Sequence, residues 1–498
     1  SSISTPKMET SPAPSERLAQ GVACSGGPDP EEALEEDEDF PGCCGKGGIF
    51  ASVLVLIGTS LGGGLLSVPY VLRLCGTALG LTLLMLGGLF SHFGLTALMQ
   101  MSWKAGPNGT SYGQLFAHCM GPVAAPVLDG MLFIYGMGAC TAYLVLIGDF
   151  VPALSKLVAD GQPIPWYADR TAAILFACAL CVPTSLQPDV SCLRFLTPIS
   201  LASLAYTGTV VAVKAYSEFH EHHGEPGYGK VELVDVNLHF FEAMGLCSFA
   251  FNCHLNAVPV ALDIVCAEAD LSKTITTVSA FANIIPMLFY AAIGMTGYLS
   301  FLAETPQDIL VGYASGAPLV VVARVLLTCS MLVVLPVNSV PTIRSGLQLL
   351  DYLSGKRCTV EVRPPSSARV ISASTAGQPL RTAETGVVSQ EPRPAPRRAL
   401  SAQSMGHRPK DFPTALRVTV GLVCLALEAA TALLVKNIAT INSFLGSTIS
   451  VAMMALIPVY CMDKMLDKTL SNRLKQAFLV LVAVLNLVSV PLMPIIGS

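Results

Sequence analysis

The sequence GTSLGGGLLSVPY, residues 58–70, places three consecutive glycines and a proline inside one uncharged apolar run, residues 47–72. A membrane crossing needs about 20 residues of helix, so this run is long enough to span a bilayer. Each glycine costs roughly 1 kcal/mol relative to alanine in a helix interior, which favours a break here. Peptide groups freed at that depth are costly in hydrocarbon unless they line a polar cavity or bind a ligand. The stretch therefore predicts either a broken helix with a binding site, as in many secondary transporters, or a glycine seam for close helix packing.

The composition is that of a polytopic membrane protein. Of the 498 residues, 52% are hydrophobic and only 13% are charged, and the mean hydropathy is +0.60. The net charge of −5 is small, and nothing in the charge pattern indicates a nucleic-acid partner. Most of the 16 cysteines fall singly in apolar runs, where a reduced thiol behaves as a small hydrophobe. We therefore expect no metal site and no cofactor. Residues 1–46 are polar and acidic and contain no short apolar core, so we expect no cleavable signal peptide there.

Eleven apolar runs are long enough to cross a membrane, and they predict an all-α membrane protein with eleven transmembrane helices. Residues 1–46 form an acidic tail and residues 351–411 a basic loop, both with compositions that predict disorder. Helices one to eight then fall within residues 47–350 and helices nine to eleven within residues 412–498. The runs cover residues 47–72, 74–103, 130–148, 171–188, 195–213, 243–262, 274–303, about 309–343, 418–435, 437–462 and 476–496.

Lysine and arginine collect in two of the predicted loops, which sets the expected orientation. Cytoplasmic loops carry an excess of these residues, and short links report orientation better than long loops. The 351–411 loop, the amino-terminal tail and the short link between the last two helices are therefore expected on the cytoplasmic side. We expect an integral protein of the plasma membrane rather than of an endosomal or lysosomal membrane. The basic residues of the short link are Lys464, Lys468, Arg473 and Lys475.

A second interruption is predicted in the sixth helix, within the sequence CSFAFNCHLNAVP at residues 247–259. Polar side chains occur there in mid-helix, and the ring of Pro259 removes a backbone hydrogen bond one turn back. Broken first and sixth helices, separated by four spans, fit two inverted repeats of five helices with one helix left over. This pairing favours the binding-site interpretation of the glycine cluster.

The two breaks together suggest a site for a small zwitterion. Free amides at the positive end of a half-helix would hold its carboxylate, and free carbonyls in the sixth helix would receive its ammonium group. A coupling cation would be held by first-helix carbonyls and a hydroxyl of the eighth helix, although such hydroxyls often bond their own backbone instead. The predicted substrate-binding residues are Gly62, Gly63, Gly64, Phe249, Ala250, Phe251 and Asn252, and the predicted ion-binding residues are Gly58, Leu61, Thr328 and Ser330.

Three ionisable side chains within the spans have a functional and a structural interpretation. His254 is either a proton carrier or, as we favour, a neutral residue that ties helices together. Glu428, with Lys436 as its potential partner, is a functional candidate because it is ionisable within a membrane, or else a polar contact between helices. Arg324 is expected to extend toward the outer interface or to pair with an acidic residue, Asp308 or Glu304.

Four sequence motifs, in the expected order, resemble the amino acid/auxin permease superfamily, and most closely solute carrier family 38, the sodium-coupled neutral amino acid transporters. The resemblance covers the chain from about residue 48 to its end, except for the 351–411 loop. The motifs are GGGLLSVPY at 62–70, similar to G-x-G-I-L-x-x-P-Y; FAFNCH at 249–254, similar to F-A-F-x-C-H; GYLSF at 297–301, similar to G-Y-L-T-F; and VARVL at 322–326.

The resemblance implies eleven helices in the inverted-repeat fold and alternating-access movement of neutral amino acids. The family's sodium-coupled members usually carry asparagine where this chain has Gly58, so sodium coupling, proton coupling and uniport stay open. The alternative is a receptor that binds an amino acid and signals through its cytoplasmic tail and loop. An enzyme is not expected, because no H-E-x-x-H or G-x-S-x-G motif and no acidic pair within a span occurs.

Overall fold

The computed structural model describes residues 48–109, 111–158, 165–187, 197–222, 228–264, 270–355, 412–435 and 437–496. Within these ranges every regular element is a helix, and no strand occurs. Nine of the helices are long and apolar enough to cross a membrane, or ten if one bent pair counts as a single span. A helix satisfies its own backbone hydrogen bonds, which is what a chain of this composition requires in hydrocarbon. The prediction of an all-α integral membrane protein is confirmed.

The helices follow the predicted runs along the chain, with short 3-10 and π-helical segments between some of them. In order they are α1 (Ile49–Ser60), η2 (Gly63–Ser67), α2 (Val68–Cys75), α3 (Thr77–Ala105), α4 (Tyr112–Met120), α5 (Ala124–Val158), α6 (Arg170–Ser185), α7 (Thr197–His222), α8 (His239–Ala250), η6 (His254–Asn256), α9 (Ala257–Asp263), α10 (Leu271–Phe301), α11 (Ile309–Gly312), α12 (Pro318–Leu353), α13 (Thr414–Leu434), α14 (Ile438–Leu445), η9 (Gly446–Ser450), η10 (Ala452–Leu456), α15 (Ile457–Met465) and α16 (Leu470–Ile496).

Two of the predicted spans differ from the helices observed. The fourth corresponds to α6, whose 16 residues are fewer than a bilayer crossing needs, so the count of eleven stays a prediction. The eighth begins later than expected, at Pro318 rather than near residue 309. Residues 309–312 form the separate short helix α11, capped by Asp308, and Pro318 at the start of α12 has the fixed backbone angle that suits a first helical turn.

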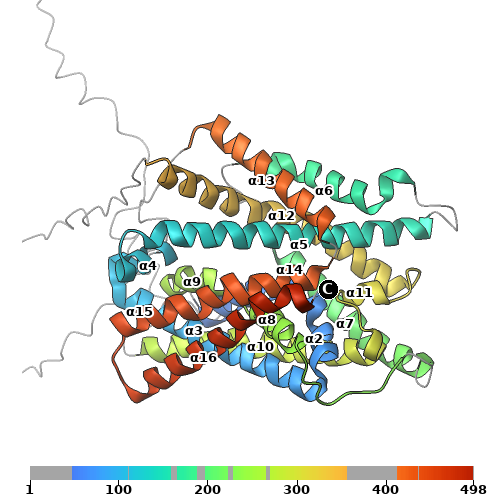
Figure 1. The fold of residues 1–498 in the computed structure, drawn as a ribbon, viewed down its shortest axis with the longest axis horizontal. Coiled ribbons are helices and arrows are strands. Elements are labelled where there is room, and N and C mark those ends of the chain that lie inside the picture. The colour runs from blue at the N-terminus through green and yellow to red at the C-terminus, as the bar shows by residue number, and fades with distance from the viewer. Residues whose placement is uncertain are drawn as a thin grey trace, which may run out of the picture. The chain divides into compact units, whose positions relative to one another are not determined.

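The helices pack in two groups that surround the broken segments. The first group centres on α5, which packs along α12 and also contacts α6 and α13 (Figure 1). The second centres on α10, which packs against α3, α7, α2 and α1. The interrupted helix α8 contacts α2 of the second group as well as α14, η9 and α16. Elements far apart in the sequence thus meet around the two predicted breaks.

The contact between α8 and η9 depends on two glycines without side chains. A Cβ atom on Gly446 would overlap the carbonyl oxygen of Gly245 and lie 2.9 Å from the amide nitrogen of Phe249. A Cβ on Gly245 would in turn overlap the hydroxyl oxygen of Ser447. Small residues allow membrane helices to approach to backbone contact, so these positions set the distance between α8 and η9.

We expect Gly446→Ala to lower the stability of the purified protein, because the added methyl group meets backbone atoms that cannot rotate away. Forcing extra atoms into a packed interior costs about 1–3 kcal/mol. The melting temperature in detergent measures this loss. Gly130→Ala is the control, since the nearest atom to its Cβ would be a methyl carbon of Leu349 at 3.9 Å. Equal melting temperatures for the two variants would contradict the close approach.

Candidate functional site

The first membrane segment is interrupted at the glycine cluster, as predicted. Helix α1 ends at Ser60, and the helical segment that resumes at Gly64 runs at 59° to it. Gly62 lies between them in an extended conformation, with φ −134° and ψ −153°. Pro69 stands in the first turn of α2, where its missing N–H would have no partner in any case. Three glycines therefore end one half-helix, and the proline helps to begin the next.

The break leaves peptide amides without acceptors. Leu65 donates its backbone N–H to the carbonyl oxygen of Gly62 at 3.1 Å, which closes the first turn of η2. Among the residues that the structure describes, no backbone hydrogen bond outside the helices is donated by the N–H groups of Gly62 and Gly64. A Cβ on Gly62 would meet no atom within 4 Å, whereas one on Gly64 would lie 3.3 Å from the Cα of Ala250. Open space therefore adjoins Gly62, and Gly64 packs on the sixth segment.

The sixth segment is also interrupted at the predicted place. Helix α8 ends at Ala250, the 3-10 turn η6 covers His254–Asn256, and α9 resumes at Ala257. The backbone N–H of Asn252 donates to the carbonyl of Phe249 at 3.2 Å, and its side-chain amide donates to the hydroxyl of Ser450 at 3.1 Å. Both predicted breaks therefore exist, and the second is fixed to the π-helical segment η9.

The carbonyls freed in the sixth segment accept hydrogen bonds from other helices. The hydroxyl of Ser91 on α3 donates to the carbonyl oxygen of Phe251 at 3.0 Å. The carbonyl oxygen of Ala250 lies 3.0 Å from the phenol oxygen of Tyr290 on α10. A carbonyl oxygen has two lone pairs, so the Ala250 oxygen keeps one for a further donor. The Phe251 oxygen also accepts the backbone N–H of Cys253 at 3.1 Å, so both of its lone pairs are used.

Tyr290 joins the two breaks. Its side chain is fully buried, and its single hydroxyl hydrogen is shared between the carbonyl oxygens of Ser60 at 2.7 Å and Ala250 at 3.0 Å. Its ring stands edge-on to Phe251, with 5.3 Å between the ring centroids. Sequence reasoning missed this residue. The available signal was a tyrosine in the middle of an apolar run, because a buried phenol hydroxyl usually finds a partner.

A second polar contact links the segments at a more exposed position. The side-chain amide of Asn256 in η6 donates to the hydroxyl of Thr59 in α1 at 3.1 Å. Together with the contact of Gly64 and Ala250, it places the residues predicted to bind a substrate on facing segments. The structure brings these two sets together, although the segments lie more than 180 residues apart in the sequence.

The predicted ion-binding residues are not brought together in the same way. Helix α1 packs mainly on α10, whereas α12, which carries Thr328 and Ser330, packs mainly on α5 and α7. The Thr328 hydroxyl donates to the carbonyl of Arg324 in its own helix at 2.7 Å. In the described part of the chain no hydrogen bond connects Gly58 or Leu61 with α12. The ion site stays a prediction.

His254 is buried beside the second break. Its side chain has no solvent exposure, and its Nε2 atom would lie 2.9 Å from a Cβ placed on Gly94 of α3. Neither ring nitrogen has a hydrogen-bond partner in the described part of the chain. The ring nitrogens therefore form no tie between helices here, and the structural role favoured by the sequence stays a prediction.

The short helix α11 packs against η2 and is held by Arg324, the buried arginine at the start of α12. The guanidinium donates from Nη2 to the carbonyl oxygens of Leu310 at 2.7 Å and Tyr313 at 3.1 Å. Arg324 therefore does not extend to solvent, and it binds carbonyls rather than forming an ion pair with Asp308 or Glu304. Asp308 accepts the backbone N–H of Leu310 at 3.0 Å.

We expect the protein to become less stable as the pH rises from about 4 to about 7, because of the buried carboxyl of Asp308. Burial raises the pKa of this carboxyl to about 7, the Leu310 N–H lowers it, the nearby Asp149 raises it, and Arg324 lowers it. In the unfolded chain an aspartate loses its proton near pH 4, so within this window only the folded state holds the proton. Raising the pH therefore favours the unfolded state.

Melting temperatures between pH 4 and pH 8 test this expectation. Asp308→Asn should remove that part of the pH dependence, whereas Asp270→Asn, at an exposed position before α10, should retain it. Identical pH profiles for the wild type and Asp308→Asn would contradict the assignment.

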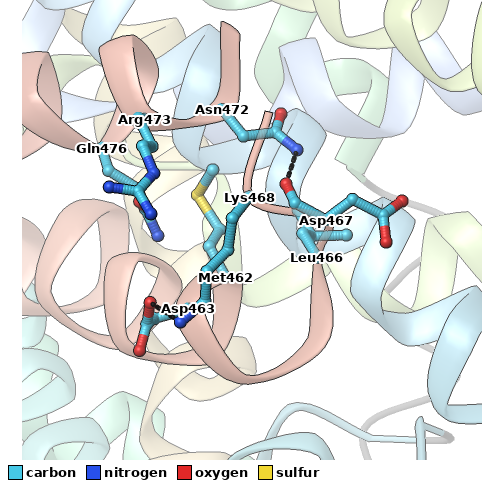
Figure 2. A pocket seen from close by; sticks show the side chains of 8 residues that line it. All are labelled: Met462, Asp463, Leu466, Asp467, Lys468, Asn472, Arg473 and Gln476. Atoms are coloured by element: carbon cyan, nitrogen blue, oxygen red, sulfur yellow. Dashed lines mark hydrogen bonds and ion pairs between the residues drawn. The ribbon is translucent and has the colours of Figure 1, made fainter. Parts of the chain in front are cut away.

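A surface hollow of about 120 Å³ lies at the turn between α15 and α16, away from both breaks in the sequence (Figure 2). Two of its charged side chains, Asp463 and Lys468, pair with each other, and Asp467 pairs with Lys104 outside the hollow. Lys468 lies 3.4 Å from a carboxylate oxygen of Asp463, and the amide of Asn472 donates to the carbonyl of Asp467 at 2.9 Å. None of the predicted site residues line it. The lining residues are Met462, Asp463, Leu466, Asp467, Lys468, Asn472, Arg473 and Gln476.

Comparison with known proteins finds relatives along most of the chain. The family model described as transmembrane amino acid transporter protein matches residues 45–497. A putative amino acid transporter AAT1 of Toxoplasma gondii is 30% identical over 62% of this chain and 41% of its own length. Vacuolar amino acid transporter 5 of Schizosaccharomyces pombe is 27% identical over 54% of this chain and 62% of its own length. Sodium-coupled neutral amino acid transporter 7 of Homo sapiens is 27% identical over 61% of this chain and 65% of its own length.

These matches span less than two thirds of the relatives' own length. The family match, in contrast, covers nearly all of the chain that carries membrane helices, including both interrupted segments and the helices that hold them together. The family is one of transporters and not of enzymes, and its members include the group that the four sequence motifs resemble. The chain belongs to the family of transmembrane amino acid transporter proteins.

Proposed function

We propose that this protein is a secondary active transporter that moves small neutral amino acids across a membrane by alternating access. The observation that carries the proposal is the meeting of two helix breaks, with Gly64 against Ala250 and one tyrosine hydroxyl reaching a carbonyl of each segment. Broken helices at a midplane site are how many secondary transporters bind their substrates. Membership of an amino acid transporter family supports the substrate class.

In this proposal the substrate carboxylate binds at the glycine cluster. In the described part of the chain the amides of Gly62 and Gly64 donate no backbone hydrogen bond outside the helices, and open space adjoins Gly62. Gly63 lies between them at the start of η2. The substrate ammonium group binds the remaining lone pair of the Ala250 carbonyl, and Phe249, Phe251 and Asn252 line the site beside it. A substrate with a small side chain fits this site best, because the two broken segments are already in contact at Gly64 and Ala250.

The proposed architecture has eleven transmembrane helices, arranged as two inverted repeats of five with one helix left over. The breaks in α1–α2 and in α8–α9 occupy equivalent positions in such repeats. Two groups of helices, centred on α5 and on α10, are then the bodies that move relative to each other. Alternating access follows when the site opens to one side of the membrane at a time.

The coupling ion is either sodium or a proton in this proposal. A sodium site would use the carbonyls of Gly58 and Leu61 with a hydroxyl of Thr328 or Ser330, which requires α12 to approach α1 in another conformation. Under that arrangement, Thr328→Ala combined with Ser330→Ala makes uptake insensitive to sodium. Unchanged sodium dependence in the double variant would exclude these hydroxyls as ligands.

Uptake of radiolabelled neutral amino acids into proteoliposomes tests the proposed function. Accumulation against a gradient, with sodium and pH gradients imposed separately, identifies both transport and its driving ion. An amino-acid receptor that signals through its tail and loop would bind the substrate without accumulating it. Binding without uptake under every gradient would therefore replace the transporter by that receptor.

We place the protein in the plasma membrane, with its amino terminus in the cytoplasm. A vacuolar relative makes an internal membrane the alternative. Fractionation of the source cells with an antibody to the protein separates the two. Enrichment with a vacuolar or lysosomal marker would overturn the plasma-membrane location.

A further inference from the structure

Glu428 is a carboxylic acid enclosed within the membrane region of α13. Its side chain has no solvent exposure, and apart from the facing thiol of Cys140 its carboxyl oxygens have no hydrogen-bond partner among the described residues. It belongs to the first helix group, in which α13 packs against α5, α6 and α12 (Figure 1). The proposed substrate site does not use this group.

The titratable groups that face Glu428 are all thiols. Cys140 reaches it from α5, and Cys140 also lies 3.4 Å from the hydroxyl of Ser339 on α12, which presents no charged group there. From α6 and from α13 itself, the facing groups are Cys178, Cys181 and Cys424. No cation among the described residues forms an ion pair with the carboxyl. Lys436 lies outside the described residues.

These surroundings decide the charge of Glu428 in the conformation observed. Moving a carboxylate out of water without a cation or strong donors is very costly, and a group in that situation takes up a proton instead. Thiols are weak hydrogen-bond donors and do not replace the lost water. Glu428 is therefore a neutral acid here, and it can lose its proton only in a conformation that admits water.

Helix α5 connects this acid with the substrate site. The ring of Tyr135 lies beside Phe249 in the second break, with 6.0 Å between the centroids. Cys140, which faces Glu428, follows five residues later, about 7.5 Å along the helix and about 140° around it. A shift of α5 that changes the enclosure of Glu428 therefore also moves the wall of the second break.

We propose that Glu428 binds the proton that drives transport. A hydronium ion on the side of higher proton concentration transfers its proton to a carboxylate oxygen of Glu428 and leaves as water, which gives the neutral acid and permits the enclosed packing seen here. After the helices rearrange, the acid returns that proton to water on the other side and becomes a carboxylate again. This assignment rests on the proposed transport function and specifies a proton as its coupling ion.

The decisive experiment compares wild type, Glu428→Gln and Thr431→Val in proteoliposomes. Glutamine has the shape of the neutral acid but cannot release a proton. Glu428→Gln is expected to retain the exchange of internal for external amino acid. Its accumulation of amino acid under a pH gradient should be at least about tenfold lower than that of wild type, a difference equal to about 1.4 kcal/mol. Thr431 is exposed on α13 and bonds its own helix, so its removal should change neither measurement.

Three results have distinct meanings. If Glu428→Gln accumulates substrate under a pH gradient as well as wild type does, Glu428 is not the coupling site. If wild type shows neither exchange nor uptake, the transport function itself fails. The third result is spectroscopic: with isotope-labelled glutamate, infrared titration of wild type should show the carbonyl stretch of a protonated, slowly exchanging glutamic acid that is missing in Glu428→Gln. Its absence would overturn the proposal.

Discussion

Replacing Gly62 with leucine is expected to reduce amino acid uptake by at least about tenfold, a loss of about 1.4 kcal/mol or more in binding free energy. The side chain would enter the space that adjoins the free amides, where no protein atom lies within 4 Å of the Cβ position. The backbone of Gly62 has an extended conformation that other residues can also adopt, since its φ angle is −134°. The protein should therefore fold as before and lose the room for a carboxylate.

The measurement is initial uptake in proteoliposomes, with melting temperature recorded in parallel. The uptake rate of Gly62→Ala should lie between those of wild type and Gly62→Leu, because a methyl group occupies less of the same space than the leucine side chain. Gly130→Leu, on α5 with its nearest neighbour atom at 3.9 Å, controls for adding a large apolar side chain elsewhere. Unaltered uptake in Gly62→Leu would mean that the substrate does not occupy the space beside the glycine cluster.

Tyr290→Phe is expected to lower both the melting temperature and the uptake rate, because it removes the hydroxyl that holds the two breaks together. The carbonyls of Ser60 and Ala250 would lose their donor in a buried region. A buried polar group left without a partner costs about 1–3 kcal/mol. The phenyl ring still packs edge-on to Phe251, so the effect isolates the hydrogen bonds from the ring contact.

Tyr206→Phe provides the matched control, since its hydroxyl makes a single long contact of 3.4 Å with the carbonyl of Leu319 at an exposed position. It should leave both measurements unchanged. Uptake by Tyr290→Phe should fall by about tenfold, the change that 1.4 kcal/mol produces. A Tyr290→Phe protein that melts and transports like wild type would show that the two breaks keep their arrangement without this bridge.

The two interruptions were predictable from the sequence because their causes are local. Consecutive glycines at 62–64 disfavour helix wherever they occur, and Pro259 removes a backbone donor regardless of its neighbours. Long apolar runs likewise report membrane helices without knowledge of packing. The same local reasoning was weaker at helix ends, where Asp308 capped a separate short helix and Pro318 began α12 later than the apolar pattern suggested.

The sequence by itself determined an integral, all-helical membrane protein with breaks near Gly62 and Ala250, because chain propensity and hydropathy act over a few residues. Only the tertiary structure decided that these breaks face each other and that Tyr290 bridges them. Those contacts join residues far apart in the chain. They depend on how whole helices pack, which no local pattern of residues encodes.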